Sequence, residues 1–258
     1  IYAGEIIRMA TNTNSTQTLK RGLDILFVLG EAGTTLSVSE IAERVSIPES
    51  TAYRLLQTME RSGVIERRDK GQIGLGMRIL HLARSLSEEM NLRLNEIARP
   101  VMEELTGEVN ETTVLTIRTG LDVICIESCE STRLIRFVVE NGKLLPLHQG
   151  ASGKAILAFE RKQIINQVIR SLENINEQEQ LLKELEQIKK EGYSFTCNEV
   201  DHEVFGVAAP IFDKSRQVIA SLTIAGPVER MDEQSRVKYI EAVTESANKI
   251  TTMMEFKV

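Results

Sequence analysis

The sequence predicts an α+β protein with an N-terminal winged helix-turn-helix, a connecting helix and a larger C-terminal domain built on a mainly antiparallel sheet. Three observations predict this arrangement. Three short helical patterns precede two short strands around an Asp-Lys-Gly turn, one uninterrupted amphipathic pattern follows, and the later strands are joined mostly by hairpin turns. We place the three parts at residues 17–75, 76–92 and 93–258.

The composition is that of a globular chain, and its charge is unevenly distributed. Hydrophobic residues make up 42% and charged residues 26% of the 258 residues, which excludes a disordered or fibrous protein. The net charge is −6, but residues 1–85 carry 11 basic and 9 acidic residues, whereas the remainder carries 20 and 28. The first third is therefore the part that suits contact with phosphate.

The sequence predicts a cytoplasmic protein with no membrane partner. Its apolar runs span a handful of residues, whereas a membrane helix needs about 20. Residues 1–16 lack the apolar core of a secretory signal, and three cysteines in a chain of this size fit a reducing compartment. We expect Met9 to be the natural start and residues 1–8 to be an added leader.

The helices of the first domain are predicted from apolar spacing and from capping residues. The first is expected over residues 18–30, where Leu19, Leu23, Leu26 and Phe27 follow helical spacing and Gly33 stops the helix. The second begins after Ser37, because Glu40 stands three residues later and completes a capping box. The third has Pro48 in its first turn and ends near Gly63.

The third helix and the hairpin after it carry the side chains that suit DNA. Polar residues face outward on the helix, three cations lie within four residues at the hairpin tip, and two more lie on the first helix. A single exposed charge is usually only solvated, but this conjunction predicts base and phosphate contacts. The expected DNA-contacting residues are Lys20, Arg21, Ser50, Thr51, Tyr53, Arg54, Gln57, Arg67, Arg68 and Lys70.

The second domain is expected to alternate hairpins with helices. It opens with a helix that Pro100 bends. The expected strands lie at residues 113–118, 121–127, 134–140, 206–212 and 217–225. The expected helices lie at residues 153–159, 161–172, 177–191 and 232–255.

The sequence also has features that could indicate an enzyme or a redox or metal sensor. The Gly-Ala-Ser-Gly-Lys run at 150–154 lacks the first glycine and the Ser/Thr of a phosphate loop, and no catalytic constellation stands out in residues 93–258. An enzyme with a fused winged helix is therefore the weaker alternative. A redox or metal sensor using Cys125, Cys129 and Cys197 is a further alternative, since strand alternation would put the first two on one face. We expect no cofactor and no metal, because the cysteine spacing is not that of a zinc site.

Several blocks of the sequence resemble the IclR-type family of bacterial transcriptional regulators. Residues 36–44 read LSVSEIAER and residues 48–63 read PESTAYRLLQTMERSG, which resemble the DNA-binding half of that family. Residues 146–158, PLHQGASGKAILA, are similar to its P-x-H-x-x-A-x-G-K-A-x-L-A stretch. Residues 206–213 and 224–227 resemble its later blocks, so the likeness covers residues 18–255 in order.

The resemblance implies a ligand-responsive repressor rather than an enzyme. It implies a homodimer or homotetramer that binds a double-stranded DNA operator, and a GAF-like effector domain that senses a small organic acid and controls a catabolic operon. The pocket positions carried over from the family are Leu134, Phe137, Ala151, Ser152, Thr196, Gly206, Thr223 and Ala225.

The implied pocket has an apolar side and an anion-binding side. Leu134 and Phe137 would line the apolar side, while Ala151 and Ser152 would offer backbone N–H groups at the start of a helix, where anions bind readily. Some relatives have Asp in place of Thr196 and Ser in place of Ala225. These two departures change which polar groups of a ligand can be satisfied.

Overall fold

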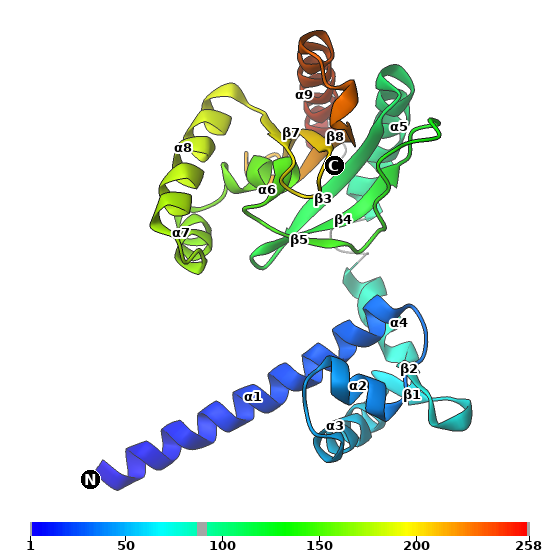
Figure 1. Cartoon of the computed structure of the whole chain (residues 1–258), viewed down its shortest axis with the longest axis vertical. Coiled ribbons are helices and arrows are strands. Elements are labelled where there is room, and N and C mark those ends of the chain that lie inside the picture. The colour runs from blue at the N-terminus through cyan, green and yellow to red at the C-terminus, as the bar shows by residue number, and fades with distance from the viewer. Residues whose placement is uncertain (1, 87–91, 257–258) are drawn as a thin grey trace. The chain divides into compact units, whose positions relative to one another are not determined.

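The computed structural model describes the backbone of residues 2–86 and 92–256 and the side chains of residues 16–69, 71–82 and 93–255. The chain divides into two compact units, Ile1–Asn91 and Leu92–Val258. The α+β class predicted from the sequence is confirmed, and most of the helices and strands of each unit are labelled in Figure 1.

The first unit is a winged helix-turn-helix. Its elements are α1 (Tyr2–Ala32), α2 (Val38–Arg44), α3 (Glu49–Arg61), β1 (Ile65–Arg67), η1 (Asp69–Gly71), β2 (Ile73–Leu75) and α4 (Met77–Leu86). The expected capping box is present, because Glu40 N–H donates to Ser37 Oγ and Ser37 N–H donates to Glu40 Oε2 at 2.8 Å. Gly33 and Gly63 have φ of +60° and +74°, so each ends its helix in a conformation that glycine adopts without strain.

One apolar row of α1 packs inward, and a second apolar row is left in solvent. Ile25 and Leu29 are buried against α2, α3 and the wing, which is the hairpin formed by β1, η1 and β2 (residues 65–75). Leu19, Leu23 and Phe27, in contrast, are 65%, 43% and 60% exposed. Phe27 is two positions after Ile25, which is about 200° around a helix, so the two rows point apart. The helix also begins at Tyr2 rather than at residue 18.

The predicted connecting helix is only partly described. Helix α4 covers Met77–Leu86, and residues 87–91 of the expected helix at 76–92 lie outside the described residues. The next helix, α5, runs from Leu92 to Val109 and contains Pro100.

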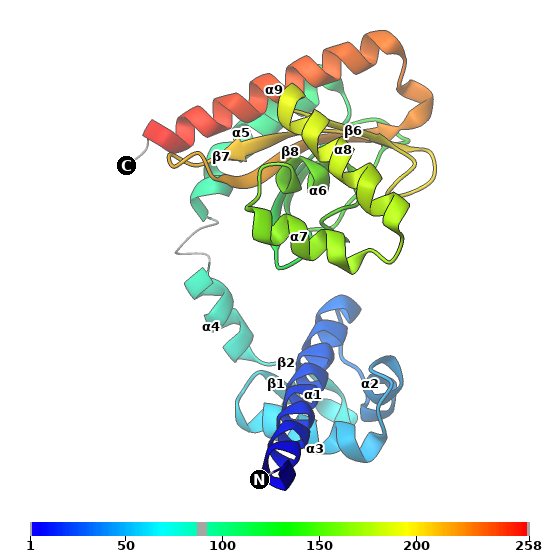
Figure 2. The same cartoon turned by 90° about the vertical axis from the view of Figure 1, so that its left-hand side faces the viewer.

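The second unit is a six-stranded antiparallel sheet with helices on both faces. The strands are β3 (Thr112–Thr119), β4 (Asp122–Cys129), β5 (Leu144–Pro146), β6 (Ser194–Cys197), β7 (Val204–Phe212) and β8 (Val218–Pro227), in the order β5-β4-β3-β8-β7-β6. The remaining helices are α6 (Gly150–Leu157), α7 (Lys162–Ser171), α8 (Ile175–Glu191) and α9 (Glu233–Phe256), with a short η3 at Val228–Arg230. Figure 2 shows α5 and α9 on one side of the sheet and α6, α7 and α8 on the other.

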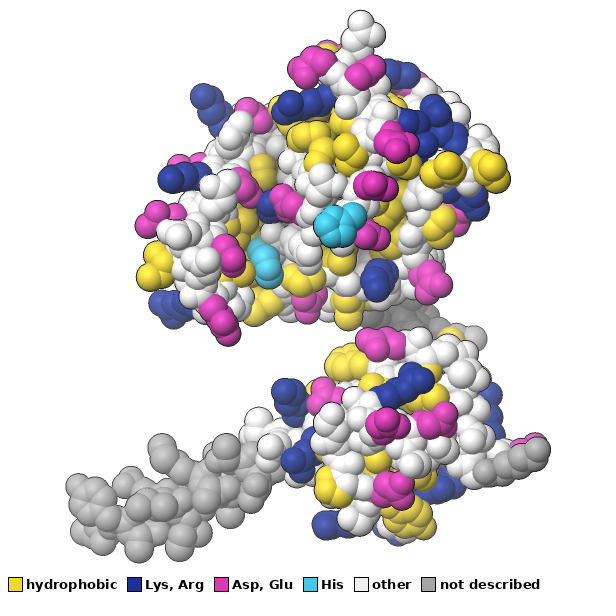
Figure 3. All heavy atoms as spheres, viewed as in Figure 1, with side chains coloured by type: hydrophobic (Ala, Val, Ile, Leu, Met, Phe, Trp, Pro, Cys, Tyr) yellow, Lys and Arg dark blue, Asp and Glu magenta, His cyan; other side chains and the backbone are white. Residues whose placement is uncertain are grey.

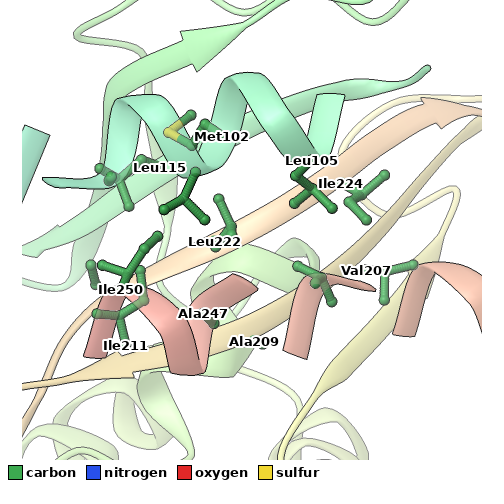
Figure 4. Close-up of a cluster of buried hydrophobic side chains, with 14 of the residues drawn as sticks. Met102, Leu105, Leu115, Val207, Ala209, Ile211, Leu222, Ile224, Ala247 and Ile250 are labelled. Atoms are coloured by element: carbon green, nitrogen blue, oxygen red, sulfur yellow. The ribbon is translucent and has the colours of Figure 1, made fainter. Parts of the chain in front are cut away.

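Two hydrophobic clusters hold these layers together. The larger one lies between the sheet and the helices α5 and α9, where Met102, Leu105, Leu222 and Ile250 are nearly inaccessible to solvent (Figure 4). The smaller one joins the opposite face of the sheet to α6, α7 and α8. Burial of apolar surface stabilises the fold by about 25 cal/mol per Å². The two clusters therefore hold the helices of both layers against the sheet.

One predicted strand is wrong and two strands were missed. Residues 134–140 form no strand, because side chains take their backbone carbonyls: Thr112 Oγ1 donates to Phe137 O at 2.6 Å and Arg230 donates to Ile135 O at 3.2 Å. The strand that follows instead is β5, and β6 forms the opposite edge of the sheet. Both have only three or four residues, too few for an alternating pattern to stand out.

Candidate nucleic-acid interface and binding cavity

Helix α3 turns one face into the core and leaves the other in solvent. Ala52 and Leu56 are fully buried against α1 and α2, which leaves the polar residues of the helix outside. Ser50, Arg54 and Gln57 are exposed, and so is half of the Tyr53 side chain. Arg54 forms no ion pair or side-chain hydrogen bond with any residue that the structure describes. Its guanidinium is therefore available to another molecule.

The wing carries cations that already have intramolecular partners. Arg67 Nε lies 3.1 Å from Glu60 Oε2, and the same guanidinium lies over the ring of Tyr53 at 5.4 Å. Arg68 pairs with Glu66 at 2.9 Å. Exposed pairs of this kind are worth about 0–1 kcal/mol each, so a phosphate can displace them. The side chain of Lys70 lies outside the described residues.

The remaining predicted contacts lie at the margins of this surface. Lys20 is exposed and Arg21 half-buried on α1, and Thr51 is half-buried in the first turn of α3. On the face of the second unit shown in Figure 3, Lys and Arg side chains are interspersed with Asp and Glu.

A cavity opens in the second unit between the sheet and helix α6. The empty space inside it, counted together with its open mouth, is about 580 Å³. Its wall takes side chains from β3, β4, β6, β7 and β8, from α6 and from segment 137–145. The lining residues are Val114, Thr116, Val123, Cys125, Phe137, Val139, Lys143, Leu145, Ala151, Ser152, Thr196, Val200, Val204, Phe205, Gly206, Thr223 and Ala225.

The structure brings seven of the eight predicted pocket residues to this wall. The exception is Leu134, which is 95% exposed and lies outside the cavity, so the expectation that it lines the apolar side is wrong. The reason is the irregular path of its segment, whose carbonyls accept hydrogen bonds from Thr112 and Arg230 while Leu134 points to solvent. Phe137, three residues later, does reach the cavity.

Two glycines make room for this wall. A Cβ on Gly206 would lie 3.1 Å from Ala151 Cβ and 3.5 Å from Thr196 Oγ1, so glycine keeps the space between α6 and β6 open. A Cβ on Gly150 would lie 2.5 Å from Val200 Cγ2, and its φ is +72°. The start of α6 and the loop that carries Val200 can therefore approach closely.

The start of α6 is partly occupied by a carboxylate of the protein itself. Gly150 N–H donates to Glu199 Oε2 at 3.1 Å, and Lys154 Nζ lies 2.7 Å from both Glu199 Oε1 and Glu184 Oε2. The buried Lys154 is thus neutralised on the side of α6 away from the cavity. The residues Ala151 and Ser152, which follow Gly150, line the cavity. Of the groups at the start of α6, only the backbone N–H groups of Ala151 and Ser152 are therefore left to bind an anion in the cavity.

Some hydroxyl groups of the cavity wall form hydrogen bonds within the protein, and one does not. Ser152 Oγ bonds to Thr223 Oγ1 at 2.9 Å, and Thr116 Oγ1 bonds to Ser221 Oγ at 2.7 Å. Thr196 is 7% exposed, and its hydroxyl makes no hydrogen bond within the part of the chain that the structure describes. Buried hydroxyl groups are normally satisfied, so Thr196 has a hydrogen bond to offer a ligand.

Cys125 and Cys129 lie on opposite faces of the sheet, contrary to the prediction from strand alternation. A bulge in β4 is responsible, because Leu115 opposes Glu127 whereas Thr116 opposes Cys125, which leaves Ile126 as an extra residue. Cys125 lines the cavity and Cys129 packs against the cluster beside α5. The residues that the structure describes include no group of three His, Cys, Asp or Glu that could hold a metal ion.

Burial makes Cys125 a poor nucleophile. Desolvation raises the pKa of its thiol from 9.0 to about 11. Since the thiolate is the reactive form, alkylation by iodoacetamide at pH 8 should run about 100-fold slower than at a free cysteine and rise about tenfold per pH unit. Mass spectrometry of the folded protein over pH 7–10 measures this rate. Fast labelling of Cys125 at pH 7 would contradict the assignment of an inert cavity thiol.

Comparisons with known proteins cover both units. Residues 18–69 match the IclR helix-turn-helix domain, and residues 87–252 match the family described as bacterial transcriptional regulator IclR C-terminal. The HTH-type transcriptional regulator KipR of Bacillus subtilis is 30% identical over 224 residues, which are 84% of this chain and 89% of the relative. The transcriptional repressor IclR of Escherichia coli is 27% identical over 257 residues, 95% and 92% of the two chains.

A solved structure shows the same fold with a ligand. An IclR homolog from Microbacterium hydrocarbonoxydans, crystallised in complex with 4-hydroxybenzoate, is 27% identical and superposes with a TM-score of 0.73. The match covers 92% of this chain and 98% of that one. Among the described residues, no helix is both long and apolar enough to cross a membrane.

Proposed function

Because the chain belongs to the IclR family of bacterial transcriptional regulators, we propose that it is a repressor of a catabolic operon that responds to a small carboxylate effector. The chain is a DNA-binding regulator and its relatives are regulators, not enzymes. The observation that supports a small carboxylate effector is the cavity beside α6. Its wall combines apolar side chains with the start of a helix and an unpartnered hydroxyl. A DNA-binding repressor would act in the cytoplasm.

A carboxylate effector suits both sides of this cavity. The amides of Ala151 and Ser152 lie at the positive end of α6, and Thr196 brings a hydroxyl rather than a carboxylate that would repel an anion. Val114, Val123 and Phe137 offer apolar surface to the rest of the molecule. The relative whose crystal structure contains 4-hydroxybenzoate supports a ligand with a carboxylate and an apolar body.

DNA contact would run through the outer face of α3 and through the wing. We propose that the exposed residues of α3 meet base edges in the major groove, while Arg67, Arg68 and Lys70 meet phosphates, with Lys20 and Arg21 beside them. The wing cations would exchange their weak pairs with Glu60 and Glu66 for phosphate.

A homodimer would cover the apolar row on α1. Leu19, Leu23 and Phe27 are spaced four residues apart, and each is at least 43% exposed. Such a row is costly to leave in water, and a dimer would place two α3 helices on the half-sites of a pseudo-palindromic operator. A tetramer would be two such dimers. Multi-angle light scattering on the full chain measures the state directly, and a monomer at micromolar concentration would contradict the proposal.

Neutralising the wing should change the salt dependence of DNA binding. Replacing Arg67, Arg68 and Lys70 by glutamine should make the slope of log K against log salt shallower by roughly two to three units per chain, because each phosphate contact contributes about 0.9. Affinity should fall about equally for all DNA sequences. Fluorescence anisotropy at 50–300 mM salt measures the slope. A slope that stays unchanged, together with a preference altered at one base position, would show that the wing contacts bases instead.

A thermal-shift screen tests the effector class. A ligand that binds only the folded chain raises the melting temperature, by an amount that grows with its concentration over its dissociation constant. We expect organic acids with an apolar body to stabilise the second unit, and the amides of the same acids to have little effect. Stabilisation by neutral sugars or by amines, and not by acids, would refute a carboxylate effector.

A further inference from the structure

Lys143 lies on the wall of the cavity at the edge opposite Thr196. Cys125 N–H donates to Lys143 O at 3.0 Å, and Gly142 N–H donates to Cys125 O at 2.7 Å, which continues the antiparallel pairing of β4 with β5. In that pairing Val123 opposes Leu145, and both face the cavity. Opposed residues share a face and side chains alternate along a strand, so Cys125 and Lys143 face the cavity as well.

The ammonium of Lys143 has no partner among the described side chains. It forms no ion pair and no hydrogen bond with any residue whose side chain the structure describes. Lys154 on α6 differs in this respect, because its Nζ lies 2.7 Å from a carboxylate oxygen of Glu184 and 2.7 Å from one of Glu199. Among the described lining residues, Lys143 is the charged one. The cavity therefore presents an unneutralised positive charge at its β4–β5 edge.

The opposite end of the cavity has its own polar groups. Thr196 lies on β6, beside the start of α6, and its hydroxyl is unpartnered. Strands β3, β8 and β7 separate β4 from β6 in the sheet, so the two polar ends stand apart. Val114 and Val123 line the wall between them. A ligand that fills the cavity meets polar groups at both ends and apolar surface between them.

We propose that Lys143 binds a second acidic group of the effector, which makes the effector a dicarboxylate-type molecule with an apolar middle. The inference rests on the proposed carboxylate effector and extends it. One acidic group would take the amides at the start of α6 and the hydroxyl of Thr196. The other would pair with Lys143 by a charge-assisted hydrogen bond. A monoacid satisfies one end only and leaves the exposed Lys143 ammonium in contact with water.

The test compares matched monoacids and diacids on the full chain. The probes are benzene-1,4-dicarboxylate against 4-methylbenzoate, and heptanedioate against hexanoate, measured by isothermal titration calorimetry at fixed ionic strength. The wild type should bind each diacid roughly 10-fold more tightly than its monoacid, the factor expected for one partly exposed charged hydrogen bond. Lys143→Gln should remove that preference and leave monoacid affinity unchanged. Lys183→Gln, on the exposed face of α8, is the control and should bind like the wild type.

The outcomes separate this inference from the proposed function. If monoacids bind and diacids bind no better, Lys143 is not a second anchor and the carboxylate effector stands. If Lys143→Gln weakens monoacids and diacids equally, Lys143 instead holds the single carboxylate, and the two-ended effector is refuted. If no acid binds the wild type, both proposals fail together. Because Lys143 is exposed at the cavity mouth, its replacement by glutamine should not perturb folding, and an unchanged melting temperature without ligand checks this.

Discussion

Replacing Arg54 by alanine should lower the affinity for a specific DNA site about 5- to 150-fold at matched salt. The guanidinium stands on the outer face of α3, is exposed, and has no partner among the described residues. A bidentate contact of arginine with a guanine edge is worth about 1–3 kcal/mol of discrimination, and its loss relaxes specificity at that base pair. Electrophoretic mobility shift with a fragment enriched from a random library measures both effects.

A control separates this loss from a general loss of charge. Arg170→Ala removes an exposed helical arginine from α7, in the other unit, and should leave affinity for DNA unchanged. The free energy of unfolding should change little in either variant, since surface substitutions are usually within about 0.5 kcal/mol. Wild-type affinity of Arg54→Ala for the enriched fragment would show that α3 does not recognise DNA through this residue.

Replacing Ala151 by leucine should abolish the response to an effector and leave DNA binding intact. Ala151 is 3% exposed on the cavity wall, and its Cβ faces Gly206, so three added carbons fill the space where the ligand would lie. Calorimetry with 4-methylbenzoate should show at least a 100-fold loss of affinity in this variant. Some destabilisation is expected too, because overpacking costs about 1–3 kcal/mol.

A milder variant keeps this prediction testable if the leucine disturbs folding. Thr196→Val has nearly the same shape and removes only the unpartnered hydroxyl, so it should weaken acid binding by roughly 5- to 10-fold without loss of stability. If Ala151→Leu folds, binds DNA and still responds at the wild-type concentration of effector, residues 150–154 serve only to pack α6 on the sheet. The ligand site must then lie elsewhere.

Local signals explain why the first unit was predictable. The capping box of Ser37 and Glu40, the proline before α3 and the glycines after α1 and α3 each act within a few residues, so the sequence alone locates α2, α3 and the end of α1. The face of α1 was not predictable in the same way. Its two apolar rows look alike in sequence, and only the packing of α2 and α3 selects Ile25 and Leu29.

The cavity was predictable only in part. The family resemblance supplied seven wall residues, but Leu134 failed because tertiary hydrogen bonds from Thr112 and Arg230 override the strand-like pattern of its segment. Cys125 and Lys143 were missed as wall residues. The bulge at Ile126 has no recognisable sequence pattern. Strand β5 has only three residues, too few for an alternating pattern to show which of them face inward.

We propose that ligand binding in the cavity changes the binding of DNA by the same chain. This coupling is measured as the affinity of the full chain for an enriched DNA fragment, by fluorescence anisotropy at fixed salt, with and without an acid that raises its melting temperature. A regulator with coupled sites should change that affinity about 5- to 150-fold, and Ala151→Leu should show no change. An acid that saturates the wild-type cavity and leaves its DNA affinity unaltered would contradict the claim.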